Sequence, residues 1–197
     1  MSDFTVNKEV LSKKEKYKLL FVGRLDWTKW VDVLINSIEE LVDKWFHDFI
    51  LNIVWYGYDE EIYKKMVSDK NLWKYIHFVW QKTWKELKEY YATSDIMIVP
   101  SRAEWFGIII LEAMASWIPV IATKSGWPED IIQNEENWFL VDNENSSMIS
   151  DKILSLINMN KKDLNTIISN GFDTIKKKYT REIIAEKVCE QYLLLKK

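Results

Sequence analysis

Glycine is scarce in this sequence. The 197 residues contain 5 glycines, 3 prolines and 1 cysteine, but 11 tryptophans. An average glycine usage of about 7% would give roughly 14 glycines in a chain of this length. Because glycine is the residue that adopts positive φ angles and allows close backbone approach, the shortage raises the question of which residues form the tight turns.

Other scarce residues exclude whole classes of site. The single cysteine, Cys189, excludes an internal disulfide and any metal site built from several cysteines. Only two histidines occur, His47 and His77, and His77 lies in a strand-like segment. We therefore expect no protein-bound metal ion. A net charge of -3 argues against a nucleic-acid partner, because binding to phosphates needs an excess of cations.

Long apolar runs are also missing. No window approaches the ~18 apolar residues of a membrane span, and the first residues lack the apolar stretch of a signal peptide. The composition therefore predicts a soluble, cytoplasmic protein.

The apolar segments that are present are short, and they alternate with amphipathic helical patterns. The expected strands are 18–23, 49–55, 75–80, 96–100, 118–123 and 138–142. This alternation predicts an α/β fold, a doubly wound, Rossmann-like parallel sheet of about six strands. Residues 1–16 are expected to be a linker or tail, and 17–197 one domain, with C-terminal helices from about residue 145. The last helix carries an apolar stripe that we expect to cover the sheet edge: Ile183, Ile184, Val188, Tyr192 and Leu195.

Ligands of such sheets bind beyond the carboxyl ends of the strands, and the loop GRLDWTKW follows the first strand. It begins at Gly23 and contains Arg24 and Lys29, just before a helix expected to start near Val31. Two cations in front of a helix N-terminus can hold an anion. The alternative is a pair of solvated surface cations.

The segment AEWFGIIILE follows the fourth strand and holds Glu104 and Glu112 with seven residues between them. Glu104 is expected in the loop and Glu112 about one and a half turns into a helix that starts near Gly107, so both could face one crevice. A carboxylate can accept hydrogen bonds from a sugar diol, and the free amides of residues 106–108 would suit a phosphate. The alternative is a solvated glutamate plus a charge near a helix start.

These segments, with IVWYG, FVWQ, SGWPE and ENWFLV, resemble the C-terminal, donor-binding domain of retaining GT-B glycosyltransferases of the glycosyltransferase 4 family, from about residue 18 to 142. The resemblance implies that Arg24 and Lys29 hold the donor diphosphate, that Glu104 lies near the transferred sugar, and that Glu112 binds the ribose. The other residues that it places at the substrate are Gly23, Phe106, Gly107, Ile108 and Ser125.

The same resemblance implies a hexosyltransferase that uses a nucleoside-diphosphate sugar as donor and needs no cofactor. The partner would be an acceptor-binding domain, in the same polypeptide or as a separate subunit, and without it this chain is expected to be inactive. The complete enzyme could associate peripherally with a membrane. Two other function classes are considered. The first is a non-catalytic nucleotide-sugar-binding module. The second is a Rossmann oxidoreductase, which is disfavoured because GRLDWTKW lacks the G-x-G-x-x-G pattern.

The tryptophans depart from the family pattern, which has glycine at seven of their positions: Trp30, Trp55, Trp80, Trp105, Trp117, Trp127 and Trp138. Glycine would also be ordinary at the other four, which are Trp27, Trp45, Trp73 and Trp84. Exchanging all eleven gives 5 + 11 = 16 glycines, about 8% of the chain. We hypothesise that the codons are UGA, which some genetic codes read as tryptophan and others as glycine. The alternative is an unusual tryptophan-rich homologue. Indoles at Trp30, Trp105 and Trp127 are then predicted to obstruct the donor crevice.

Overall fold

The computed structural model describes residues 15–57, 59–105 and 107–194. Six parallel strands form one sheet in the order β3-β2-β1-β4-β5-β6. The strands are β1 (Tyr17–Leu25), β2 (Phe49–Gly57), β3 (Ile76–Trp80), β4 (Ile96–Val99), β5 (Val120–Thr123) and β6 (Phe139–Val141). This confirms the predicted fold class. Residues 1–14 of the predicted tail lie outside the described residues.

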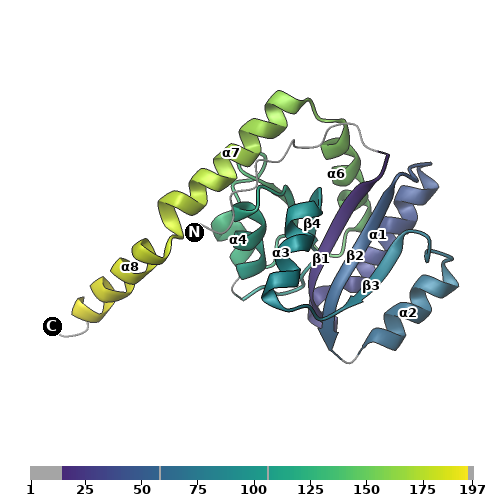
Figure 1. Ribbon diagram of the computed structural model, residues 1–197, viewed down its shortest axis with the longest axis horizontal. Coiled ribbons are helices and arrows are strands. Elements are labelled where there is room, and N and C mark those ends of the chain that lie inside the picture. Colours follow the sequence, from purple (N-terminus) through teal and green to yellow (C-terminus); the bar gives the residue numbers. More distant parts are fainter. Residues whose placement is uncertain (1–14, 58, 106, 195–197) are drawn as a thin grey trace.

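Helices cover both faces of the sheet (Figure 1). The helix α1 (Val31–Asp43) contacts α2 (Glu60–Asp69) and α6 (Ser146–Asn158), and α4 (Ile108–Ala115) contacts α7 (Lys161–Lys178). The remaining helical elements are the 3-10 helix η1 (Trp27–Lys29), α3 (Trp84–Thr93), α5 (Trp127–Ile131) and α8 (Arg181–Leu194). The chain is therefore helical from Ser146 to Leu194 apart from short connections, as its periodicity predicts.

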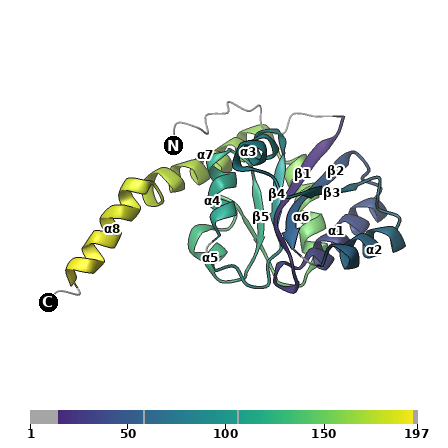
Figure 2. The same cartoon turned by 60° about the horizontal axis from the view of Figure 1, so that its bottom comes forward.

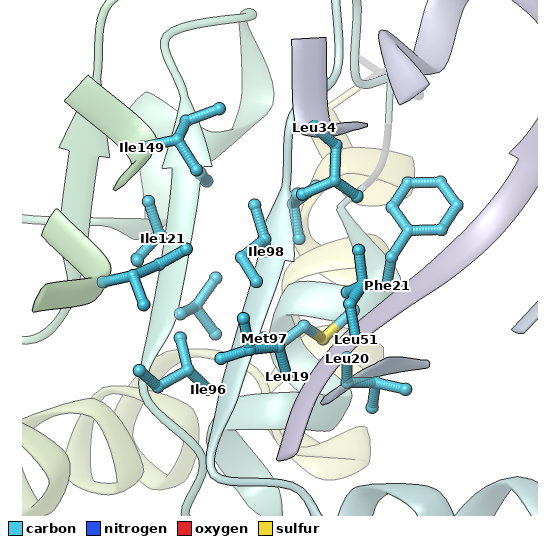
Figure 3. Packing of buried hydrophobic residues seen from close by; sticks show 14 of the residues in the cluster. Leu19, Leu20, Phe21, Leu34, Leu51, Ile96, Met97, Ile98, Ile121 and Ile149 are labelled. Carbon is cyan, nitrogen blue, oxygen red and sulfur yellow. The ribbon is translucent and has the colours of Figure 1, made fainter. Parts of the chain in front are cut away.

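Burial on both faces explains the uninterrupted apolar runs. Every residue of β4 and of β5 is buried, because helices cover the sheet from each side. Figure 3 shows the packing between strands and helices, with Leu19, Leu51, Ile98 and Ile121 of the sheet close to Leu34 of α1 and Ile149 of α6. Burial of these side chains is the main favourable term that holds the sheet in place.

The last helix differs from the prediction. Figure 1 shows α8 continuing beyond α7 and pointing away from the sheet, so it does not cover the sheet edge. Ile184 is 45% exposed on this helix. The prediction was wrong because an apolar stripe identifies a face that needs covering, and does not identify its partner. The described side chains of this stripe are those of Ile183 and Ile184; Leu195 lies outside the described residues.

Candidate functional site at the switch point of the sheet

The strand order reverses between β1 and β4, which are hydrogen-bonded neighbours with Leu19 opposite Ile96. From β1 the chain enters η1 and α1, and from β4 it enters α4 on the other face of the sheet. Such a reversal leaves a crevice at the carboxyl ends of the two strands, where ligands of doubly wound folds bind. These loops lie along the lower edge of the molecule in Figure 2, together with α5.

The loop after β1 is shaped by Asp26. Its carboxylate accepts a hydrogen bond from the Thr28 backbone N–H at 2.9 Å and one from the Thr28 hydroxyl, and its carbonyl accepts from Lys29 N at 3.1 Å. Aspartate is a preferred residue at a helix N-cap because it satisfies a free backbone donor in this way. The cap tightens the chain into η1 and sets the direction of Lys29, the last residue of that turn.

The loop after β4 is tied by its backbone to the loops on both sides. Arg102 N donates to Thr28 O at 2.7 Å, and Glu104 N donates to Ser125 O at 3.0 Å. Glu104 also forms an isolated parallel bridge with Gly126, at the start of α5. These bonds bring residues distant in sequence together, so the loops after β1, β4 and β5 form one connected surface.

Lys29 and Glu104 meet at the centre of this surface. Lys29 Nζ lies 2.6 Å from Glu104 Oε2, and the two side chains are 13% and 11% exposed. Ser101 completes the cluster, since its hydroxyl donates to Glu104 Oε2 at 3.0 Å and accepts from Lys29 Nζ at 3.4 Å. An ammonium group has three donors, so two are used here and the third can bind a ligand oxygen.

The other oxygen of Glu104 faces the start of α4. Glu104 Oε1 accepts a hydrogen bond from Gly107 N at 3.4 Å, and Gly107 is the N-cap of α4 with φ of +52°. Ile108, the first residue of the helix, is 58% exposed. The predicted helix start near Gly107 is confirmed, while Phe106 lies outside the described residues.

Arg24 is placed differently from the prediction. It was expected in the loop, but β1 continues two residues past Gly23, so Arg24 is part of the strand. Its Nε lies 3.2 Å from Asp26 Oδ2, and its side chain is 54% exposed. The residue that caps η1 also holds the guanidinium, and so Arg24 is paired locally instead of with the Lys29–Glu104 cluster.

Glu112 has its own partner on α3. The Tyr91 hydroxyl donates to Glu112 Oε2 at 2.7 Å, and Tyr91 is fully buried. Burial raises the pKa of the Glu112 carboxyl, while the hydrogen bond from Tyr91 acts to lower it. Burial, together with the nearby Glu112 charge, also raises the pKa of the Tyr91 hydroxyl well above its usual range. The tyrosine thus fixes one carboxylate oxygen and leaves the other for a further donor.

Three residues of this region were missed from the sequence: Ser101, Asp26 and Tyr91. Ser101 lies two residues after the end of β4, in PSRAE, and its position after a buried strand was the available signal. Asp26 could have been identified from the D-x-T pattern of a capped turn. Tyr91 carried no signal, because the sequence of the amphipathic segment KELKEYYATS does not show whether a tyrosine in it packs in the core or binds a site residue. Among predicted residues, Ser125 contributes its carbonyl to Glu104 N, and its hydroxyl donates to Thr123 O at 3.3 Å.

Within the described part of the chain, no group of three or more His, Cys, Asp and Glu side chains is arranged to hold a metal ion. None of its helices is both long enough and apolar enough to span a bilayer.

Comparison with known proteins identifies the family. The sequence profile described as "Glycosyl transferases group 1" matches residues 3–173. The chain belongs to this glycosyltransferase family. An uncharacterized glycosyltransferase of Methanocaldococcus jannaschii is 34% identical over 175 residues, which cover 87% of this chain and 47% of that protein. The poly(ribitol-phosphate) alpha-N-acetylglucosaminyltransferase of Staphylococcus aureus is 31% identical over 180 residues, 84% of this chain and 33% of that one. The chain thus spans less than half the length of these glycosyltransferases.

Solved structures place this glycosyltransferase chain in one half of the GT-B fold. The C-terminal domain of a glycosyl transferase group 1 family protein from Francisella tularensis superposes with a TM-score of 0.74 at 32% identity, covering 84% of this chain and 87% of that domain. An S. aureus TarM structure that contains UDP gives a TM-score of 0.82 at 26% identity, covering 95% of this chain and 38% of TarM. The described residues therefore have the fold of a GT-B C-terminal domain.

Proposed function

We propose that this chain is the donor-binding half of a retaining glycosyltransferase that takes a sugar from a nucleoside-diphosphate sugar. The observation that carries the proposal is the Lys29–Glu104–Ser101 cluster, with a 2.6 Å ion pair between the loops that flank the strand-order reversal. The TarM structure, whose sequence is 26% identical to this chain, contains UDP, which supports a nucleotide ligand for this fold.

The proposed chemistry is the departure of a nucleoside diphosphate. When the bond between the anomeric carbon and the phosphate oxygen breaks, the electron pair stays on the leaving group and negative charge develops on the diphosphate. The third donor of Lys29 and the backbone amides at the start of α4 are preorganised groups of the kind that stabilise such charge. The acceptor oxygen forms the new glycosidic bond and its proton passes to the departing diphosphate oxygen, and in a retaining enzyme the anomeric configuration is unchanged.

The other residues have distinct proposed roles. Glu104 lies beside the transferred sugar and orients Lys29, and Arg24 turns from Asp26 to the diphosphate when the donor binds. Glu112, held on one oxygen by Tyr91, accepts the ribose hydroxyls with the other oxygen. Gly23 and Ser125 lie beside the bound donor, and the backbone of Gly107 and Ile108 lies against its phosphate and sugar.

The partner in the complete enzyme is proposed to be an acceptor-binding domain, in the same polypeptide or as a separate subunit. The donor half alone then binds the nucleotide sugar and does not transfer the sugar to an acceptor. The acceptor class is proposed to be a glycan or a lipid-linked glycan, and a lipid-linked acceptor would bring the complete enzyme to a membrane surface.

Isothermal titration calorimetry tests the proposal. UDP-glucose, UDP-N-acetylglucosamine, GDP-mannose and ADP-glucose are titrated into the chain and into its glycine form, defined as the chain with all eleven tryptophans replaced by glycine. We expect one-to-one binding of at least one of them to the glycine form. The proposal would be contradicted if none of the four nucleotide sugars bound to either form while circular dichroism showed both forms to be folded.

A further inference from the structure

The backbone at the tryptophans carries an inference that does not depend on the proposed function. Nine described residues have positive φ, and they comprise three glycines, three tryptophans, one asparagine and two glutamates: Gly57, Gly107, Gly126, Trp30, Trp45, Trp117, Asn71, Glu135 and Glu144. Positive φ is rare for a bulky residue and ordinary for glycine, and asparagine is enriched there. A third of these positions are thus occupied by tryptophan, a residue type that is poorly suited to them.

Two of the three tryptophans occupy the same helix-ending motif. At the end of α1, Trp45 N donates to Val42 O at 3.0 Å and Phe46 N to Leu41 O at 3.0 Å, and Trp45 has φ of +61°. This pair of bonds defines a Schellman motif, whose left-handed residue is usually glycine and sometimes asparagine. The tryptophan therefore stands at the position of the motif where glycine is usually found.

The end of α4 repeats that motif. Trp117 N donates to Met114 O at 3.1 Å, Ile118 N donates to Ala113 O at 3.0 Å, and φ of Trp117 is also +61°. The same fold therefore places tryptophan at the left-handed position of two helix ends.

A third helix end supplies an internal comparison. At the end of α2, Asn71 N donates to Ser68 O at 3.0 Å and Leu72 N to Val67 O at 2.9 Å, with φ of +57° at Asn71. Here the same motif carries a residue that tolerates the left-handed region. The motif itself is therefore ordinary, and only the residue type at Trp45 and Trp117 is unusual.

The side chains of several tryptophans are also in positions that are unusual for this residue. Trp138 is completely buried, its Nε1 is a buried donor with no hydrogen-bond partner in the described structure, and its indole lies 2.7 Å from where a Cβ on Gly171 would be. Buried donors are almost always paired. Six of the eleven tryptophans are instead at least 46% exposed, although tryptophan is normally highly buried: Trp27, Trp45, Trp73, Trp80, Trp84 and Trp105.

We infer that glycine is the residue of the functional protein at all eleven tryptophan positions, and that the gene encodes them with UGA codons read as glycine. One exchange accounts for the missing glycines, the left-handed helix ends, the unpaired indole donor and the exposed indoles. Chance placement of tryptophan explains none of these, because each of the four observations arises from a different physical requirement.

The inference also changes the candidate site, and this part depends on the proposed function. Cε3 of Trp127 lies 2.9 Å from where a Cβ on Gly107 would be, so its indole packs against the N-cap of α4. Trp30 is the N-cap of α1, and the Arg102 guanidinium lies 5.0 Å from its ring centre. Glycine at these two positions would remove an indole from beside the start of each helix, where backbone amides can bind phosphate.

Sequencing the gene and measuring peptide masses of the protein isolated from its source cells test the inference directly. We expect UGA at all eleven codons and peptide masses that correspond to glycine. UGG at Trp45 or Trp117, or a peptide mass that corresponds to tryptophan at either, would overturn the inference whatever the outcome of nucleotide-sugar binding.

Thermal unfolding of the chain with tryptophan gives a second test. The Trp45 side chain is 87% exposed, so Trp45→Gly removes little packing and mainly relieves the backbone; we expect Tm to rise by about 3 °C. The matched control is Asn71→Trp, at the equivalent helix end, and it should lower Tm. A lower Tm for Trp45→Gly, or a higher Tm for Asn71→Trp, would contradict the inference.

Discussion

At the scale of single residues, the close approach of Lys29 and Glu104 is the main feature of the site. Both side chains are nearly buried, and a charge left in such a place without its partner is costly. Ser101 and Gly107 N stabilise the carboxylate but do not neutralise it. The pair is therefore expected to hold the loops after β1 and β4 together before any ligand binds.

A double-mutant cycle measures that coupling. Lys29→Met should lower the free energy of unfolding by up to about 3 kcal/mol, because Glu104 is left without its cation. Lys29→Met with Glu104→Gln should lower it by less than the sum of the two single changes. Urea unfolding monitored by circular dichroism gives the four values, with Lys65→Met on the exposed face of α2 as the control. Strict additivity would show that the pair is not coupled.

Glu112 predicts a pH dependence whose sign follows from its environment. Burial raises its pKa above the ordinary 4.5, so below pH 4.5 the carboxyl is protonated in both the folded and unfolded states. Ionising this carboxyl costs more free energy in the folded state than in the unfolded state. The free energy of unfolding therefore falls as pH rises from the unfolded-state pKa through the folded-state pKa. Glu112→Gln should therefore gain stability relative to the parent chain as pH increases from about 4.5, and then level off.

Chemical unfolding at several pH values between 4 and 7 gives this difference. The control is Glu61→Gln on α2, where the carboxylate side chain is 88% exposed. If the difference in free energy of unfolding between Glu112→Gln and the parent chain stays constant across this pH range, burial does not raise the pKa of the Glu112 carboxyl.

At the scale of secondary-structure elements, the helix ends follow local chemistry closely. Helix α3 begins with a capping box, in which the Thr83 hydroxyl accepts from Glu86 N at 3.4 Å and Glu86 Oε2 accepts from Thr83 N at 2.9 Å. The T-x-x-E spacing makes both bonds possible, since residues at N-cap and N3 face each other. This helix carries Tyr91, so its position also sets the hydroxyl that holds Glu112.

Removing the cap should therefore affect stability measurably. Thr83→Ala is expected to lower the free energy of unfolding by about 1 kcal/mol, as for other N-cap threonines. The matched control is Thr166→Ala on an exposed face of α7, where the hydroxyl donates to Lys162 O inside the helix and alanine is the better helix former. Equal losses in urea unfolding for the two variants would show that the cap does not act as described.

Strands and helices differed in how well the sequence predicted them. The alternation of short apolar runs with periodic segments located all six strands, because parallel strands buried on both faces have few polar interruptions. Strand ends were less certain: β1 extends to Leu25, beyond the expected end at residue 23, and this placed Arg24 in the strand. The direction of α8 was not predictable, since it depends on packing between distant segments and not on local pattern.

At the scale of the whole molecule, the strand order brings the site together. Lys29 and Glu104 are separated by 75 residues in sequence, and they meet because β1 and β4 are neighbours in the sheet. The sequence alone suggested each loop separately, and the E-x7-E segment made the resemblance to glycosyltransferases specific. The Lys29–Glu104 contact, the role of Ser101 and the Tyr91–Glu112 bond required the three-dimensional arrangement.

The measurement that tests the central claim most directly is the calorimetric dissociation constant of the preferred nucleotide sugar for the glycine form, with and without Lys29→Met. Loss of one charge-assisted hydrogen bond to the diphosphate, worth about 1.5 to 3 kcal/mol, predicts a dissociation constant at least roughly 10-fold higher. Lys65→Met should leave the dissociation constant unchanged. An unchanged dissociation constant in a folded Lys29→Met variant would contradict the claim that this switch-point cluster binds the donor.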